Sequence, residues 1–243
     1  MRVSDQGTHE TRASTAGYAE AAGQLVDQYE SVAFADVHHD VLHLFPARAG
    51  TVLDIGAGSG RDAAALAALG HRVVAVEPTA ELRARGRAIH AGAGVEWVDD
   101  ALPDLPVLRG LGHGDGQGHR ADDTDTGTGT GTVRRTDTDL SSYRRFDLIL
   151  LTAVWMHLDA AERTAAMGAL AGLLADEGRI VLSLRHGPVP PGRRMFDVTA
   201  DETVRLARTH GLHPVHRSER ADPHGRPGVR WSHLGLRGEP AGI

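Results

Sequence analysis

The sequence of 243 residues contains no cysteine, no lysine and no asparagine. Without cysteine it can form no disulfide, no thiolate zinc site and no cysteine nucleophile. All 26 basic residues are therefore arginine, yet the net charge is −6, so no overall basic field favours nucleic acid. No apolar run is long enough to span a membrane, and the first residues lack the apolar centre of a secretory signal. We therefore expect a cytoplasmic protein with neither a membrane nor a nucleic-acid partner.

Two segments are poor in apolar residues and predict no packed structure. Residues 1–14 read as a disordered leader, and residues 109–139 contain the runs GLGHGDGQGH and TDTGTGTGT. Such stretches bury too little surface to offset the entropy of ordering them. We therefore expect one domain over residues 15–243, with a low-complexity disordered insertion at about 109–139.

Apolar runs alternate with helical patterns along the rest of the chain. Two helices are expected before the first strand, over 16–29 and 32–45. Strand and helix patterns then alternate, and two further strands are expected in the tail. This order predicts an α/β fold, a single doubly wound, mostly parallel seven-stranded sheet with N-terminal helices. The expected strands cover residues 52–55, 71–76, 95–98, 146–151, 179–184, 214–218 and 229–236.

The stretch TVLDIGAGSGRDAA, residues 51–64, joins a buried strand to a helix through alternating glycines. Glycines at Gly56, Gly58 and Gly60 allow a sharp turn and a close approach of the backbone to a ligand. The amino end of the following helix presents free N–H groups to the same place. The pattern indicates a nucleotide-type pocket.

Acidic residues end the next two strands. Glu77 follows Gly56 by about 20 residues, the spacing at which a carboxylate hydrogen-bonds ribose hydroxyls. Asp99 and Asp100 end the third strand. In a doubly wound sheet these strand ends share one crevice with the glycine loop, where an acid pair could accept a hydrogen bond from an adenine amine.

The glycine loop departs from the dinucleotide fingerprint, because Arg61 stands where the third glycine of GxGxxG would be. Asp54 lies two residues before the first glycine, where a pyrophosphate would be repelled but an ammonium accepted. Adenosine joined to an amino acid is S-adenosylmethionine. A plainer interpretation leaves Asp54 as a cap on the glycine turn, and Asp99 and Asp100 as a strand-to-loop pair.

The chain resembles the class I S-adenosylmethionine-dependent methyltransferases from about Val52 to Leu184. VLDIGAGSGRDA resembles the first motif of that family and VVAVEP the second. WVDDALPDL resembles the third, with Asp99 in place of the usual glycine, and FDLILLTAVWMHLDAAER resembles the fourth. GRIVLSLR resembles the strand that follows. The resemblance implies the family's Rossmann-like fold and its cofactor.

The resemblance also implies which residues bind that cofactor. The glycine loop would hold the methionine part, the ends of the second and third strands the ribose and adenine, and the end of the fourth strand the sulfonium region. The positions implied are Asp54, Gly56, Ala57, Gly58, Gly60, Glu77, Pro78, Asp99, Asp100, Ala101, Leu102, Thr152 and Ala153.

The methyl acceptor is less well marked. Methyl transfer from a sulfonium is an in-line displacement that needs a base only where the nucleophile must lose a proton. His157 follows the fourth strand and titrates near neutral pH, so it is the candidate base, with a structural role as the alternative. The pocket-wall candidates are Tyr18, Tyr29, His38 and His39 before the first strand, Arg185 and His186 after the fifth strand, and Trp155, for which core packing is the alternative. No metal site is predicted, because His39 and His43 have helical ligand spacing but no visible third ligand.

Several acceptor classes are disfavoured by what is missing. C5 methylation of cytosine needs a thiolate, the Asn-Pro-Pro-aromatic motif needs asparagine, and the Lys-Asp-Lys-Glu set of ribose methyltransferases needs lysine. We therefore expect methyl transfer to O or N of a small-molecule metabolite. Three alternatives stay open: methylation of a protein or RNA, non-catalytic binding of S-adenosylmethionine, and a nicotinamide oxidoreductase. The oligomeric state is not predicted.

Overall fold

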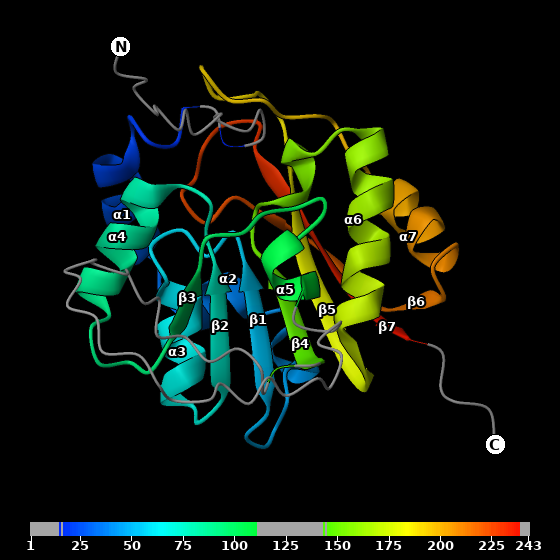
Figure 1. Cartoon of the computed structure of the whole chain (residues 1–243). Coiled ribbons are helices and arrows are strands. Elements are labelled where there is room, and N and C mark those ends of the chain that lie inside the picture. Colours follow the sequence, from blue (N-terminus) through cyan, green and yellow to red (C-terminus); the bar gives the residue numbers. More distant parts are fainter. Residues whose placement is uncertain (1–14, 16, 111–142, 144, 239–243) are drawn as a thin grey trace, which may run out of the picture.

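The computed structural model describes residues 15, 17–110, 143 and 145–238 (Figure 1). The expected leader, 1–14, lies outside the described residues. So does the expected insertion at 109–139, apart from Arg109 and Gly110. Within the described part of the chain, none of the helices has the length and apolar character to cross a bilayer.

One seven-stranded sheet forms the centre of the molecule, in the order β3-β2-β1-β4-β5-β7-β6. The first five strands in this order pair in parallel, and β7 runs antiparallel to both β5 and β6. This confirms the predicted doubly wound, mostly parallel sheet. The strands are β1 Thr51–Ile55, β2 Arg72–Val76, β3 Glu96–Val98, β4 Phe146–Leu151, β5 Leu174–His186, β6 Leu212–Ala221 and β7 Arg230–Gly238.

Helices connect the strands and precede the sheet. They are α1 Ala22–Glu30, α2 Phe34–His38, α3 Arg61–Ala68, α4 Ala80–Ile89, α5 Pro106–Gly110, α6 Ala160–Leu173 and α7 Ala200–Arg208, with 3₁₀ turns η2 Leu42–Leu44 and η5 Trp155–His157.

The N-terminal helices are shorter than the pattern predicts. The helix expected from residue 16 begins only at Ala22, and Gly17 before it has a φ of 75°, which a right-handed helix does not allow. The helix expected over 32–45 divides into α2 and η2 around Val41, whose side chain is fully buried. Propensity alone does not reveal such a break.

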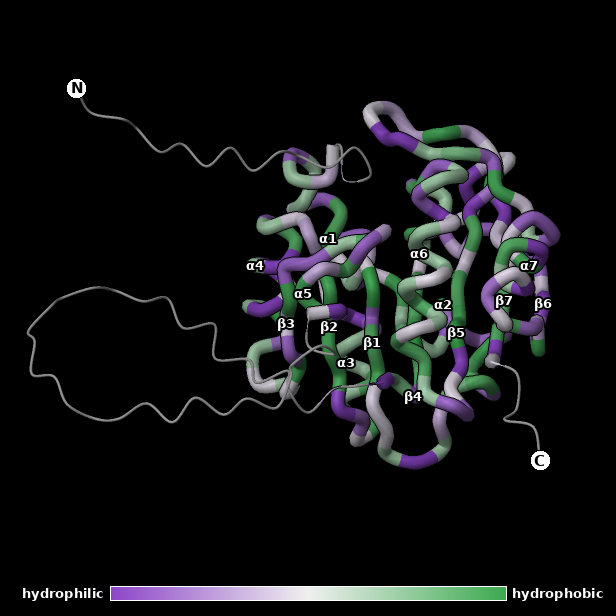
Figure 2. The backbone as a smooth tube through the Cα atoms, turned by 45° about the vertical axis from the view of Figure 1, so that its right-hand side comes forward, coloured by the Kyte–Doolittle hydropathy of each residue, from purple (hydrophilic) through white to green (hydrophobic). Residues whose placement is uncertain are grey.

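Alternating residues of the buried strands face opposite layers of helices, as the period of two in a strand requires. Leu53 and Val74 pack in the cluster that α5, α6 and α7 cover. Val52 and Val73 pack on the other side, in the cluster that contains α3. Figure 2 shows the resulting apolar colour along the central strands.

Helix α1 belongs to neither main cluster. Its buried residues Ala22 and Val26 pack with Leu82 of α4 in a small third cluster. Tyr18 and Leu25 lie against this cluster.

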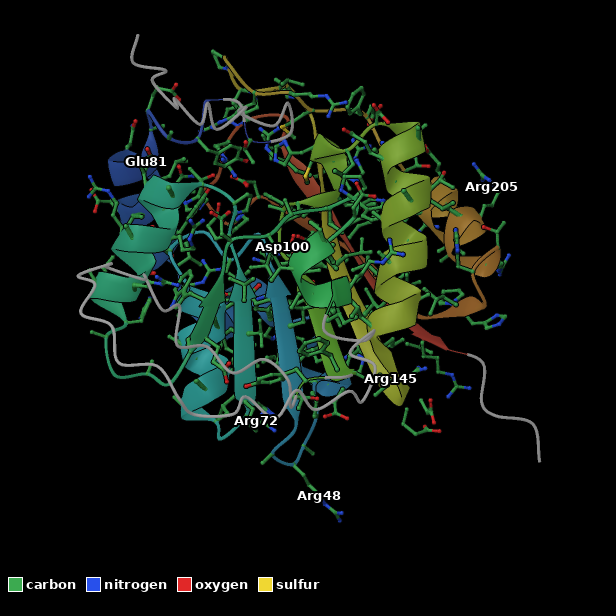
Figure 3. The ribbon with its side chains drawn as sticks, viewed as in Figure 1. Arg48, Arg72, Glu81, Asp100, Arg145 and Arg205 are labelled. Atoms are coloured by element: carbon green, nitrogen blue, oxygen red, sulfur yellow. The ribbon has the colours of Figure 1, made fainter. Side chains whose placement is uncertain are left out.

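The parallel strands carry their carboxyl ends to one edge of the sheet, and the loops there form the only place where the predicted site residues could meet. Figure 3 shows Asp100 at this end, beside α5. Arg48, Arg72 and Arg145 lie at the opposite end, where β1, β2 and β4 begin.

Candidate active site

A cavity of about 370 Å³ lies at the carboxyl edge of the sheet. Its walls come from the glycine loop, the ends of β2 and β4, the segment before α1, and the edge formed by β5, β7 and β6. The predicted residues that line it are Asp54, Gly56, Ala57, Gly58, Glu77, Pro78, Ala101, Leu102, Thr152, Ala153, Tyr18, Tyr29, His157 and Arg185.

The glycine loop is bound to the end of β2 and lies close to its neighbours. The N–H groups of Gly56 and Ala57 donate to the carbonyl of Val76 at 2.8 and 3.0 Å. Gly58 has a φ of 58°, and a Cβ there would lie 3.1 Å from the ring of Tyr29. A side chain at this position would be both strained and crowded, so glycine is required.

Gly60 has a different function from the first two glycines. It caps α3 with a φ of 84°, and a Cβ would lie 2.6 Å from Cζ2 of Trp97. The structure places Gly60 in the contact between α3 and β3, outside the cavity lining.

Glu77 ties the loop to the start of α4. Its Oε2 accepts the N–H of Gly58 at 2.8 Å, and its Oε1 accepts the N–H of Thr79 at 2.8 Å. Burial raises the pKa of this carboxyl group, and the two backbone hydrogen bonds oppose the increase. The side chain therefore stands buried at the cavity wall in a fixed orientation.

Two buried carboxyl groups, Asp54 and Asp62, lie beside the loop. Asp62 accepts hydrogen bonds from Nε of Arg61 at 2.7 Å, Nε2 of His38 at 2.8 Å and Oγ1 of Thr152 at 3.0 Å. Burial alone would raise the pKa of Asp62, but His38 and Arg61 hold it well below its ordinary value. His38 thus lies behind Asp62 rather than in the cavity wall.

The pKa of Asp54 is shifted in the opposite direction to that of Asp62. Burial raises its pKa well above the ordinary value, and the negative charge of Asp62 adds to the increase. Among the residues that the structure describes, its buried Oδ2 has no hydrogen-bond partner. The cavity therefore contains an acceptor atom that a cationic ligand would satisfy.

The predicted acid pair lies outside the cavity lining. Asp99 is half exposed and forms an ion pair of 2.7 Å with Arg83. Asp100 accepts the N–H groups of Ala101 at 2.9 Å and Leu108 at 3.0 Å, and so holds α5. Its carboxyl group turns towards α5 because that helix needs an acceptor at its amino end.

His157 and Tyr18 meet in the wall of the same cavity. Nδ1 of His157 lies 2.7 Å from the carbonyl of Arg194, and since a carbonyl only accepts, Nδ1 carries the hydrogen. Nε2 then accepts the hydroxyl hydrogen of Tyr18 at 2.9 Å. Burial lowers the pKa of His157, which keeps the ring neutral. The guanidinium of Arg193 stacks 3.7 Å from the Tyr18 ring.

Trp155 takes the core position that the sequence left open as the alternative to a place in the pocket wall. It is fully buried in the main core and does not line the cavity. The period of the motif does not separate a pocket tryptophan from a core tryptophan.

The tail forms a wall of the cavity that no sequence motif predicted. Trp231 and His233 of β7 and Arg220 of β6 line the cavity. Trp231 and His233 are two residues apart, so a strand pattern places them on one face. That signal was present, but it did not indicate which face meets the site.

Comparison with known proteins agrees with this arrangement. A sequence model of the methyltransferase domain matches residues 29–220. None of the curated proteins has a significantly similar sequence. A solved structure of 1,6-didemethyltoxoflavin-N1-methyltransferase from Burkholderia thailandensis is similar at a TM-score of 0.54 and 22% identity, over 90% of this chain and 89% of that one.

A TehB-like S-adenosylmethionine-dependent methyltransferase from Corynebacterium glutamicum is similar at a TM-score of 0.57 and 17% identity, over 90% of this chain and 99% of that one. At these identities the two structures establish the shared fold. The chain belongs to the methyltransferase-domain family and is a class I, S-adenosylmethionine-dependent methyltransferase.

Proposed function

We propose that the enzyme transfers the methyl group to an oxygen or nitrogen atom of a small-molecule metabolite by in-line displacement. One observation carries this proposal: a single cavity of about 370 Å³ joins the glycine loop and Glu77 to the Tyr18–His157 pair. That volume is in the range of small-molecule sites, about 300–1,000 Å³.

The residues at the loop end fit S-adenosylmethionine. The unpartnered Oδ2 of Asp54 suits the ammonium of the methionine part. The two oxygens of Glu77 accept two backbone N–H groups and a hydrogen bond from the Thr79 side chain, which leaves a lone pair for a ribose hydroxyl. Ala101 and Leu102 present apolar surface for the adenine ring.

The remaining predicted residues divide by their place in the structure. We propose that those lining the cavity contact the cofactor directly: Gly56, Ala57, Gly58, Pro78, Thr152 and Ala153. Gly60 and Asp100 lie outside it and act on the cofactor through the elements that they hold, and His38 and Trp155 act on the acceptor in the same way. Asp99 contributes only its exposed ion pair with Arg83.

The cofactor supplies an electrophilic methyl group on a sulfonium whose positive charge disappears in the transfer. The protein contributes position, exclusion of water and a path for the proton of the acceptor. We propose that an acceptor O–H or N–H donates to the hydroxyl oxygen of Tyr18. The hydroxyl hydrogen of Tyr18 then passes to Nε2 of His157, which ends the step as an imidazolium.

Replacing Tyr18 with phenylalanine is expected to lower kcat about 10- to 50-fold. This is less than a full general-base contribution of about 100-fold or more, because His157 stays in place. The affinity for S-adenosylhomocysteine should not change, since phenylalanine keeps the ring of Tyr18 and removes only its hydroxyl group. Steady-state kinetics and calorimetry measure the two effects.

The pH profile separates this role from a structural one. His157 must be neutral to accept the proton, and burial places its pKa below the ordinary value of 6.5. The rate of the native enzyme should therefore be constant at neutral pH and fall only below pH 6.5. His157→Gln should remove this acidic limb. A Tyr18→Phe enzyme with unchanged kcat would overturn the relay.

Binding of S-adenosylhomocysteine is expected to release up to about one proton in the pH range where Asp54 is still protonated in the free enzyme. The raised pKa of Asp54 leaves part of this carboxyl group protonated in the free enzyme, and the ligand ammonium favours the charged form. Affinity should accordingly increase with pH. Titration calorimetry in two buffers of different ionisation enthalpy measures the release, and Asp54→Asn should abolish it. Net proton uptake by the native enzyme would contradict this prediction.

Methyl-labelled S-adenosylmethionine tests the proposed acceptor class. We would incubate the enzyme with separate metabolite, RNA and protein fractions and expect label only in small molecules. Label in RNA or protein would replace the proposal with a macromolecular acceptor. Tight cofactor binding without transfer to any fraction would indicate a non-catalytic binding protein.

A further inference from the structure

The tail strands place two rows of side chains in the wall of the cavity. Arg185 of β5 pairs with Trp231 of β7, and Trp231 pairs with Arg220 of β6. Ser183 and His233 form the neighbouring pair. All five residues line the cavity, so an indole lies in the wall between two guanidinium-bearing positions.

Positive charge in this wall lacks a carboxylate partner. Nη1 of Arg185 donates to the carbonyl of Pro188 at 2.7 Å, and Nη1 of Arg220 donates to backbone carbonyls of α2. Within the described ranges, neither arginine forms an ion pair, and the buried Nε of Arg185 has no acceptor at all. A buried donor without an acceptor is costly unless a ligand supplies one.

Two acidic groups lie near this wall. Asp40 is within electrostatic range of Arg220 and His233 and is hydrogen-bonded to His39, and Asp222 is already engaged. Asp222 accepts from Nε of Arg226 at 2.9 Å, from Nη2 of Arg226 at 2.6 Å and from Nε1 of Trp231 at 2.8 Å. It therefore neutralises Arg226 and fixes the indole of Trp231. His233 adds no positive charge near neutral pH, because burial and the charge of Arg220 lower its pKa to about 4.

Arg185 also lies within electrostatic range of Tyr18 and His157. Its positive charge lowers the pKa of both Tyr18 and His157, although burial has the larger effect on each. A group bound to Arg185 thus stands near the proposed relay, with Trp231 beside it.

We propose that the methyl acceptor is a planar aromatic compound that carries a carboxylate, with the carboxylate bound by Arg185 and the ring against Trp231. A guanidinium matches a carboxylate through parallel hydrogen bonds, and an indole offers a flat apolar face. The hydroxyl or amino group that receives the methyl then faces Tyr18. This inference rests on the proposed small-molecule activity and narrows its substrate class.

Matched acids and amides test the carboxylate. With S-adenosylhomocysteine bound, 3-hydroxybenzoate and 3-aminobenzoate should bind the native enzyme at least about tenfold more tightly than their carboxamides, as expected for a charged hydrogen-bonded pair. Arg185→Gln should reduce this preference to about onefold while leaving the affinity for S-adenosylhomocysteine unchanged. Trp231→Leu should weaken the binding of acid and amide alike. Titration calorimetry measures all these affinities.

Arg217→Gln is the matched control, because Arg217 lies on β6, outside the cavity lining, and pairs with Asp201. This variant should keep the native preference for the acids. Equal binding of acid and amide by the native enzyme, binding of neither acid, or a preference that survives Arg185→Gln would overturn the proposal. Failure of the methyltransferase function itself would appear separately, as absence of S-adenosylhomocysteine binding or of methyl transfer.

Discussion

Replacing Glu77 with glutamine is expected to weaken binding of S-adenosylhomocysteine by about 100-fold or more. Glutamine has the same shape, but one of its two terminal atoms is a donor. That NH₂ group must face the N–H of either Gly58 or Thr79, both of which now donate to the carboxylate. The mispaired N–H lowers stability and displaces the loop in the free and bound enzyme alike, whereas the affinity falls because the ribose hydroxyls lose their charged acceptor. Loss of these charge-assisted hydrogen bonds costs about 3 kcal/mol, or about 100-fold in affinity.

Asp99→Asn provides the control for this experiment. Asp99 is the acidic residue that follows the next strand, but its partner is Arg83 and it does not line the cavity. Its substitution should change the affinity less than about threefold, the range of an exposed ion pair. Calorimetric titration gives both values, and circular dichroism verifies that the variants fold. A Glu77→Gln enzyme that binds within threefold of the native value would remove Glu77 from the cofactor site.

Gly60→Ala is expected to lower the free energy of unfolding by about 2–5 kcal/mol. The φ of 84° costs a residue with a Cβ about 1–2 kcal/mol. The new methyl group would also lie 2.6 Å from Cζ2 of Trp97. The indole has no room to move away, because a Cβ at Gly86 would lie 2.4 Å from its Cη2. Overpacking of this kind adds about 1–3 kcal/mol.

Gly70→Ala separates the backbone strain from the steric clash. Gly70 has a φ of 91°, but a Cβ there would meet nothing within 4 Å, so only the cost of about 1–2 kcal/mol should appear. Denaturant unfolding measures both variants. In a Trp97→Phe background, which lacks the clashing ring atoms, Gly60→Ala should cost about as little as Gly70→Ala. Equal costs in the native background would show that the contact with Trp97 is unimportant.

The sheet could be predicted because its signals are local. Apolar strand runs such as Val52–Ile55 are followed by a glycine or an acidic residue. Glu77 could be predicted as a site residue because it is the acidic residue that follows the second strand. The directions in which the side chains after β3 point could not be predicted, because they depend on contacts with α5. That helix, Pro106–Gly110, is too short to leave a periodic pattern, so nothing indicated that Asp100 would accept the N–H of Leu108.

The acceptor end of the site depends on contacts between distant parts of the chain. Tyr18 and His157 are 139 residues apart and come from elements with no shared pattern. Trp231 reaches the cavity only because β7 inserts between β5 and β6, and a sequence does not state the order of tail strands. Short sequence motifs therefore indicate the residues that bind the methyl donor better than those that bind the methyl acceptor.

The small cluster that holds α1 affects how fast the amide hydrogens of this helix exchange with solvent. Ala22, Val26 and Leu82 bury far less apolar surface than the two clusters of the sheet, so α1 should separate from α4 at a small fraction of the free energy of global unfolding. The amide hydrogens of α1 would then exchange with solvent much faster than those of β1 and β4. Movement of α1 and preservation of the sheet are thus separate events. Because Tyr29 of α1 lines the cavity, the rate of product departure can change without loss of thermal stability.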